Sequence, residues 1–376
     1  MIRFLTLTLL IAGTISCTSG KKALQQGNYS QAVLQAVERL RDHPENKNAL
    51  ATLKEAYPLA LRTLQEEIDQ ILKSNEPLKY GKVVERFESI QQMADEIRRC
   101  PPALRLLGDP ETFPEELSAA RAKAAPEAYD AGVEMLKKGN REAAKEAYYL
   151  FTEAQRFVPN YKDSAKRAAE AKMMATLKVI VEQIPVPGRY QLSSEFFYNQ
   201  VFTFLREGIR NEFLEFYHPS EAKQILQPDE ILVMEFYDFM VGATRDSDSE
   251  KEVTSKDSVK VGSATIDGRK VDVYDRVKAK YKQYKREVVS TGTLQVEVVD
   301  ARTGKVVVQR RFPGTFTWRS EWSTFNGDER ALTKEQLDAT KRKPISPPPP
   351  QELFIQFTKP IFDQVKGFIR SHYRNT

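Results

Sequence analysis

The chain has 376 residues, with 57 Lys and Arg against 52 Asp and Glu, and a formal net charge of +5. This length is enough for two domains of ordinary size. The nearly balanced charge lacks the strongly basic character of nucleic-acid-binding domains, so nucleic acid is excluded as a partner.

The first residues have the pattern of a cleaved secretory signal. Arg3 is followed by an apolar run from Phe4 to Ala12, and a small residue, Ser16, stands directly before Cys17. The apolar run is too short to span a bilayer as a helix, which is typical of a signal peptide. The sequence therefore predicts that residues 1–16 are removed on export.

The end of this signal resembles the lipobox of bacterial lipoproteins, although Thr14 stands where that family usually has Leu. The resemblance implies that Cys17 becomes the first residue and carries diacylglycerol and an N-acyl chain such as palmitate, which together hold a protein durably on a bilayer. The alternative is an ordinary secretory signal with an incidental cysteine. Acylation of Cys17 leaves Cys100 without a disulfide partner in the chain.

The residues after Cys17 bear on the location of the protein. Lys21 and Lys22 stand where some Bacteroidota-type envelope lipoproteins carry an acidic run for surface export, and Thr18 stands where an aspartate would retain enterobacterial lipoproteins in the inner membrane. By this resemblance the protein is expected in the cell envelope, anchored by its lipid to the periplasmic face of the outer membrane.

The pattern from Lys21 to Gln183 is helical. Apolar residues recur at spacings of three and four in two long segments, Lys47–Leu72 and Lys82–Arg99, as in amphipathic helices that bury one face. Prolines separate the segments.

Two shorter segments resemble the second helix of a tetratricopeptide repeat. The first contains Gly27, Tyr29, Ala32, Ala36, Leu40 and Pro44; the second contains Gly139, Ala143, Ala147, Phe151, Ala154 and Pro159. The second copy is longer than the first, so the repeat is degenerate. The resemblance implies a stacked helical array, and such arrays commonly bind other proteins. The alternative is ordinary packing between helices.

The segment Ile184–Gly188 contains Pro185 and Pro187, which cannot continue a helix, and it is interpreted as a hinge. The sequence therefore predicts two domains after the signal peptide: a helical, tetratricopeptide-like domain at 17–184 and an α+β domain at 189–376.

The second domain is expected to begin and end with helices, at Ser193–Asn211 and at Gln351–Tyr373, the latter interrupted near Pro360 and preceded by a stiff spacer at Pro347–Pro350. Between them, strands are expected in the ranges 213–217, 231–239, 277–288, 294–298, 305–308 and 312–322, and the polar segment Arg245–Ser258 is expected to be a mobile loop or a hairpin tip. The predicted fold class is α, then α+β, with an antiparallel sheet and packed helices.

The clearest hairpin turn is Asp300–Gly304, where Asp and Gly occupy positions that suit a tight turn. This hairpin, followed by the C-terminal helix, resembles domains of curli-secretion-type periplasmic lipoproteins. The resemblance covers the last third of the chain and implies a fold, not pore formation.

Arg276, Lys278, Lys280 and Lys282 recur at a spacing of two, which places four cations on one face of a strand. They are interpreted either as a contact for an anionic surface such as lipid headgroups or lipopolysaccharide, or as a solvated face protected against aggregation by its lysines.

Trp318 and Trp322 are expected to share a face of the next strand. They are interpreted either as anchors for a ligand or partner, or as a cover for the core beneath the C-terminal helix.

Residues that carry enzymatic or metal chemistry are scarce. His43, His218 and His372 are far apart, the cysteines do not have a zinc-binding spacing, and the sequence contains neither a Gly-rich phosphate loop nor a nucleophile elbow. The sequence therefore predicts a protein that is not an enzyme and has no cofactor or metal. The leading hypothesis is a scaffold or accessory subunit of an envelope complex for secretion or assembly, with other envelope proteins as partners. The alternative is an envelope protein that binds glycan, peptidoglycan or lipid.

Overall fold

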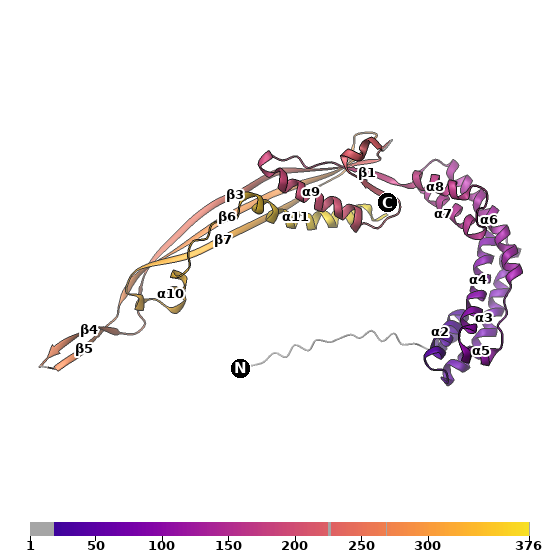
Figure 1. The fold of residues 1–376 in the computed structure, drawn as a ribbon, viewed down its shortest axis with the longest axis horizontal. Helices are drawn as coiled ribbons and strands as arrows, with labels where there is room; N and C mark the ends of the chain where they lie inside the picture. Colours follow the sequence, from indigo (N-terminus) through magenta and orange to yellow (C-terminus); the bar gives the residue numbers. More distant parts are fainter. Residues whose placement is uncertain (1–18, 225–226, 268, 376) are drawn as a thin grey trace. The chain divides into compact units, whose positions relative to one another are not determined.

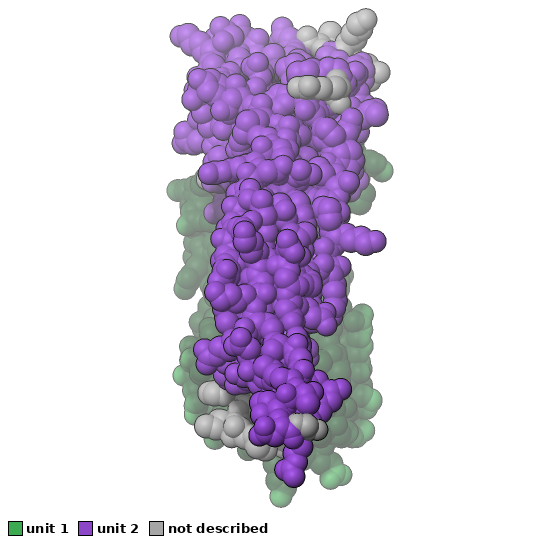
Figure 2. Space-filling model, turned by 90° about the vertical axis from the view of Figure 1, so that its left-hand side faces the viewer, with its two compact units in different colours: residues 1–175 green, residues 176–376 purple. Residues whose placement is uncertain are grey.

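The computed structural model describes residues 19–224, 227–267 and 269–375. The chain forms two compact units, Met1–Ala175 and Thr176–Thr376 (Figure 2). Their boundary precedes the proline-rich segment Ile184–Gly188, where the sequence predicts the hinge. The signal peptide at 1–16 and Cys17 lie outside the described residues.

The first unit is helical throughout its described part. Most consecutive helices pack against one another along the chain (Figure 1). The helices at Lys47–Lys73 and Lys79–Arg98 confirm the amphipathic segments that the sequence predicts at 47–72 and 82–99. The helices are α1 (Lys21–Gln25), α2 (Tyr29–Asp42), α3 (Lys47–Lys73), α4 (Lys79–Arg98), α5 (Pro101–Leu107), α6 (Pro114–Lys137), α7 (Arg141–Phe157) and α8 (Ser164–Ala175).

Small residues set the helix packing of this unit. Ala147, Phe151 and Ala154 of α7 are fully buried. The Phe151 ring fits over Gly132 of α6, where an added Cβ would lie 2.9 Å from the ring. A side chain at position 132 would therefore force the buried Phe151 ring to shift. The two repeat-like segments form α2 and α7, and the likeness to tetratricopeptide repeats stays a prediction.

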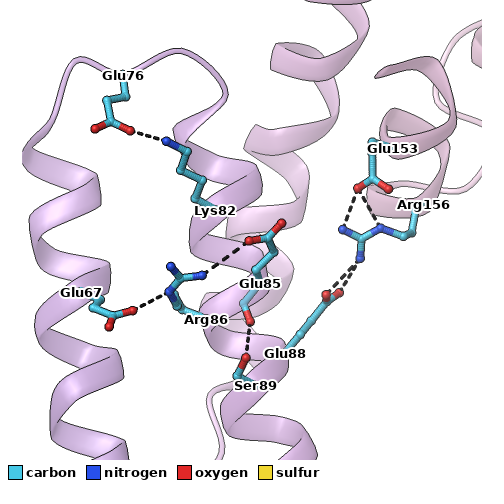
Figure 3. A network of polar contacts seen from close by, with 9 residues as sticks. All are labelled: Glu67, Glu76, Lys82, Glu85, Arg86, Glu88, Ser89, Glu153 and Arg156. Atoms are coloured by element: carbon cyan, nitrogen blue, oxygen red, sulfur yellow. Dashed lines mark hydrogen bonds and ion pairs between the residues drawn. The ribbon is translucent and has the colours of Figure 1, made fainter. Parts of the chain in front are cut away.

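Ion pairs join α4 to the three helices α3, α6 and α7, and Figure 3 shows those to α3 and α7. Arg86 of α4 binds Glu67 of α3 at 2.6 Å. Glu88 of α4 accepts hydrogen bonds from Arg121 of α6 and Arg156 of α7, both at 2.9 Å. These groups are partly exposed, so each pair contributes about 1 kcal/mol or less. Their combined effect is to favour one arrangement of the helices over alternatives.

The second unit opens with a parallel β–α–β arrangement. β1 (Leu177–Val181) leads through α9 (Gln191–Gly208) to β2 (Leu214–Tyr217), and β1 pairs in parallel with β2 on one side and with β3 (Glu230–Thr254) on the other. The sheet has the order β2-β1-β3-β6-β7, in which β6 (Lys278–Asp300) is antiparallel to β3 and to β7 (Val306–Gly327).

This sheet corrects two expectations. It is mixed rather than antiparallel, and β1 lies where the sequence predicts the end of the helical domain. The side chains of Leu177, Val179, Ile180 and Val181 are buried because β1 lies inside the sheet. A short buried strand is a continuous apolar run, which periodicity does not distinguish from a buried helix.

The core of this unit lies between the sheet and the helices α9 and α11 (Pro350–His372) (Figure 1). Its buried side chains include Leu232, Met234 and Phe236 of β3, Leu294, Val296 and Val298 of β6, and Phe354, Phe357, Ile361, Val365 and Ile369 of α11. The helix continues through Pro360, contrary to the predicted interruption. Pro360 is exposed, so water can satisfy the carbonyl group that the missing N–H leaves free.

The strands β3, β6 and β7 continue well beyond α9 and α11 (Figure 1). β3 has 25 residues, which corresponds to roughly 80 Å at about 3.3 Å per residue. We call the part formed by Ala243–Thr254, Lys278–Thr291 and Thr315–Gly327 the outer sheet. The segment Arg245–Ser258, which the sequence predicts to be a mobile loop or a hairpin tip, belongs to β3 as far as Thr254. Its alternating acidic residues pair with β6, and both of its faces are largely exposed, so it lacks the apolar alternation of a half-buried strand.

The chain between β3 and β6 forms a separate hairpin of β4 (Val259–Ile266) and β5 (Arg269–Asp275), which we call the tip hairpin (Figure 1). The return from β7 to α11 contains the short helix α10 (Lys334–Thr340). Short 3₁₀ helices occur at Gly188–Tyr190, Pro219–Gln224, Glu329–Ala331 and Tyr373–Asn375. None of the helices in the described ranges has the length and hydrophobicity needed to span a membrane.

Candidate functional site

The outer sheet carries all but one of the surface residues that the sequence selects. Lys278, Lys280 and Lys282 lie on β6, and Trp318 and Trp322 lie on the neighbouring strand β7. Arg276 lies just before β6, in the connection from the tip hairpin. The structure therefore brings the two predicted surfaces, cationic and aromatic, onto adjacent strands.

The cationic residues of β6 face an acidic stripe on β3, formed by Asp246, Asp248, Glu250 and Glu252. Lys278 binds Glu252 at 2.7 Å, and Lys282 binds Asp248 at 3.0 Å. These carboxylates raise the pKa of both lysines. The arrangement favours the interpretation of this stripe as a solvated face in which the strand charges pair with one another. Lys280 and Arg276 have no side-chain ion pair within the described ranges.

The opposite face of the outer sheet is also charged. Glu287 of β6 binds Lys285 of the same strand and Arg319 of β7, both at 2.8 Å. These two cations lower the pKa of the Glu287 carboxyl, chiefly through the hydrogen bond from Lys285. Around Glu287 this face is therefore suited to contact with water or with a polar partner, whereas Ala279 and Tyr281, nearer the tip hairpin on the same face, are buried.

Trp322 stacks on Tyr284 of β6, and the Lys282 ammonium lies 5.3 Å from the centre of the Tyr284 ring. The aromatic pair therefore borders the charged stripe directly. Trp318 lies opposite Val288 in the same strand pair. Both tryptophans are half-buried.

The Trp322 side chain lines a cleft of about 360 Å³, together with Tyr284 and with Ala339 and Arg342 from the end of α10. The chain that follows α10 stays close to β7, because the Ile345 N–H donates to the Ser320 hydroxyl at 3.3 Å. A ligand bound in this cleft, next to α10, can thus contact one edge of the stacked Trp322 and Tyr284 rings. Pockets of this volume typically bind small molecules.

The tip hairpin is a surface that the sequence analysis missed. Every second pair in its register lies on the same face, and one face therefore carries Gly262 with Val273, Ala264 with Val271, and Ile266 with Arg269. The exposed fractions of Ile266, Val271 and Val273 are 58%, 46% and 41%. The other face carries Ser263, Thr265, Lys270 and Asp272. The Asp267-Gly268 dipeptide between two β-branched runs is the sequence signal that predicts this hairpin.

In the part of the chain that the structure describes, no group of three or more His, Cys, Asp and Glu side chains is arranged to hold a metal ion. His218 contacts Ser220 and Gln183, and His372 stacks on Phe368. The comparisons with known proteins add no family: no protein-family model matches the chain, and no curated protein matches it significantly.

Proposed function

We propose that the protein is a lipoprotein of the outer membrane, anchored through Cys17 on the periplasmic side, that acts as a non-enzymatic scaffold or accessory subunit of an envelope complex for secretion or assembly. Its partners in this proposal are other envelope proteins. The helical unit provides one contact surface and the sheet unit another.

The observation that carries the proposal is the apolar face of the tip hairpin. A hairpin with no further strand or helix packed on it is marginally stable in water. Complete burial of a Val or Ile side chain contributes about 1.5–3 kcal/mol. Ile266, Val271 and Val273 are each about half exposed, so contact with a second apolar surface would stabilise the hairpin. A protein with an apolar strand or sheet surface supplies such a contact.

The open strands of the outer sheet support the same function. β7 is the last strand of the sheet, and β3 pairs with β1 only through Glu230–Leu232. In the described ranges no further strand pairs with the remaining length of either strand, so a partner strand can add where α10, α11 and the chain between them do not lie against the edge. Pro313 interrupts the row of N–H donors on β7, a feature that limits unspecific pairing at an edge.

The test is crosslinking in the cell envelope with a photoreactive residue at position 271, on the apolar face of the tip hairpin. The matched control has the same residue at position 270, on the polar face. We expect a discrete protein adduct from position 271 that the double change Ile266→Asp and Val273→Asp abolishes. Equal adducts from both positions, or an adduct that survives the double change, would contradict the proposal.

The contribution of the helical unit is tested by deleting residues 21–175 while keeping the signal sequence. We expect the deletion to remove at least one partner that the complete protein recovers from detergent-extracted membranes. Cooperative unfolding of the shortened protein is the control for its folding. Recovery of an unchanged set of partners by this folded protein would show that the helices are not a binding surface.

The cleft beside Trp322 favours a second candidate function, the binding of a glycan or peptidoglycan fragment. A sugar ring that contacts the indole edge would change its emission. Titration with soluble peptidoglycan fragments should then shift Trp322 fluorescence in a Trp318→Phe background. An unchanged spectrum at millimolar fragment would exclude this candidate.

A further inference from the structure

A second cavity, of about 380 Å³, lies at the carboxyl ends of the parallel strands β1 and β2. Its walls include Gln183, Pro185 and Val186 from the loop after β1, Glu195 and Asn199 from α9, and His218 directly after β2. In sheets with parallel strands, the carboxyl ends are the usual location of ligand sites. The volume is within the range of small-ligand pockets.

Two hydrogen bonds fix α9 against the chain that leaves β1. The Tyr198 hydroxyl donates to the Val181 carbonyl at 2.9 Å, and the Ser194 hydroxyl donates to the Ile184 carbonyl at 3.1 Å. All four residues are buried. The cavity is therefore preformed, and a ligand would not have to order its walls.

The orientation of His218 is also fixed. The backbone N–H of Ser220 donates to its Nδ1 at 3.2 Å. Because that N–H can only donate, Nδ1 accepts this hydrogen bond, and the Ser220 hydroxyl lies 2.7 Å from the same nitrogen. Nε2 lies 3.3 Å from the side-chain amide of Gln183. The ring packs edge to face with Tyr198 and Phe202, at 5.7 and 5.9 Å between centroids.

One carboxylate lines this cavity, and two more act on its wall residue Tyr198. Glu195 lines it directly and accepts a hydrogen bond from Gln191 at 3.1 Å. Burial raises the pKa of Tyr198, and the negative charges of Glu182 and Glu221 raise it further. Arg206 lies 3.8 Å from Glu221 and offsets part of its charge. No Lys or Arg occurs among the wall residues that the structure describes, so the local field favours a cation over an anion.

The cavity is next to an open sheet edge. β2 is the first strand of the sheet order, and its outer side is unpaired by any strand in the described ranges. An extended chain added along Leu214–Tyr217 would pass the cavity at the end of β2, next to His218. In recognition by strand addition, main-chain hydrogen bonds give affinity and a side-chain pocket gives specificity.

We propose that this cavity receives a Lys or Arg side chain of an extended protein segment that pairs with β2. The Glu195 carboxylate binds the cationic group, Pro185 and Val186 contact its aliphatic stem, and the Asn199 amide pairs with a peptide group. The Asn199 side chain is exposed and forms no hydrogen bond with the described part of the chain. The inference rests on the proposed function, because it assigns one recognition site to a protein that binds other proteins.

The test uses a blocked, fluorescent pentapeptide, Thr-Val-Lys-Val-Thr, and the same peptide with norleucine or Glu in the central position. Binding to the full chain is measured by anisotropy. We expect the Lys peptide to bind about tenfold more tightly than the norleucine peptide, and the Glu peptide more weakly than both, because a charge-assisted hydrogen bond is lost or reversed. Equal affinity for the three peptides would overturn the proposal.

Two variants locate the binding. Glu195→Gln should remove most of the preference for Lys over norleucine, whereas Glu207→Gln, an exposed change on the same helix, should leave it intact. A preference that persists in Glu195→Gln would show that the cation binds elsewhere. Thermal unfolding of both variants is the control for folding, which neither exposed position is expected to disturb.

This result is separable from the crosslinking at the tip hairpin. Crosslinking at position 271 without a Lys preference would leave the scaffold function in place and reject the cavity as a recognition site. A Lys preference that depends on Glu195, without crosslinking at the tip, would support the cavity and reject the tip hairpin as the contact.

Discussion

The indole ring of Trp322 lies parallel to the phenol ring of Tyr284, with 5.3 Å between the ring centroids and 7° between their planes. The two side chains come from adjacent strands, β7 and β6, and are directly opposite in the register. Such pairs contribute about 0.5–1.5 kcal/mol beyond the area that they bury. The outer sheet also buries Tyr281 and Val288 of β6, and the stacked pair adds to this apolar contact.

Loss of the stacked pair should destabilise the outer sheet. We expect Trp322→Ala to lower the free energy of unfolding of the sheet unit by about 1–2 kcal/mol, because the variant loses the stacking contact and the partial burial of the indole side chain. Tyr284→Phe keeps both rings and should stay within about 0.5 kcal/mol of the original chain. Urea unfolding followed by β-type circular dichroism measures both. Equal losses in the two variants would contradict a role for stacking.

Asp328, at the end of β7, should titrate at unusually low pH. Hydrogen bonds from the Arg330 side chain and backbone lower its pKa from 3.8 to about 2. Because the pKa is lower in the folded chain, the stabilisation by this carboxylate is present above about pH 4 and is lost as the pH falls towards 2. Carbon-13 NMR should give a midpoint near 2, and Arg330→Gln should move it towards the ordinary value. An unchanged midpoint in the variant would exclude Arg330 as the cause.

The close approach of α11 to β7 predicts a strong effect at Gly314. A Cβ at this position would lie 2.3 Å from the Phe357 carbonyl oxygen and 2.6 Å from Ile361 Cγ1. We expect Gly314→Ala to destabilise the sheet unit by about 1–3 kcal/mol, since overpacking forces the backbone to shift.

Gly262 in β4 is the matched control for this change. It has no atom within 4 Å of an added Cβ and no positive φ. Gly262→Ala should therefore be neutral or slightly stabilising in the same urea titration. A neutral Gly314→Ala would mean that α11 packs less closely than the structure shows.

Cys100 should report the unfolding of the helical unit. Its side chain is fully buried, and its thiol lies 3.7 Å from the Val37 carbonyl oxygen. In a Cys17→Ser variant, a maleimide should react with Cys100 only when the helices open. The labelled fraction in increasing urea should therefore follow the loss of helical circular dichroism. Rapid, complete labelling in native buffer would contradict the buried position.

The lipid anchor predicts a specific effect of Cys17→Ala. This change removes the acceptor of the lipid, so the chain should no longer incorporate a palmitate analogue or be cleaved by the lipoprotein peptidase. In-gel detection of the analogue and the mass of the N-terminal peptide measure the two effects. Equal incorporation by both chains would favour the alternative of an ordinary secretory signal.

Much of the helical unit could be predicted from sequence because its helices have one apolar stripe each. The predicted segment Lys47–Leu72 differs from α3 by one residue at its end. The cap residues Asn46 and Asn140, which accept hydrogen bonds from Ala49 and Ala143, begin α3 and α7 by local chemistry alone. Such elements depend on neighbours within a few residues, so the sequence contains the information in one place.

The missed features depend on residues far apart in the chain. β1 pairs with β2 although the whole of α9 lies between them in the sequence, and at their carboxyl ends Gln183 lies next to His218 in the wall of the cavity. In the sequence, neither Gln183 nor His218 belongs to a recognisable motif, so neither residue indicates the cavity. The spacing of the lysines predicts the cationic stripe of β6, but the polar sequence of the matching stripe on β3 predicts a mobile loop or a hairpin tip. The pairing of Lys278 with Glu252 depends on the register of the two strands.

The central position of β6 has a consequence for the order in which the sheet unit folds. The contact between β3 and β6 that is nearest in sequence is Thr254 with Lys278, at the start of β6, and pairing with β7 starts at Val299 with Val306, at its other end. Each further pair encloses only slightly more chain, so each step costs little additional loop-closure entropy. We therefore expect β6 to pair with β3 and with β7 from opposite ends. Its pairing with β3 starts beside the tip hairpin, and its pairing with β7 starts at the Asp300–Gly304 turn.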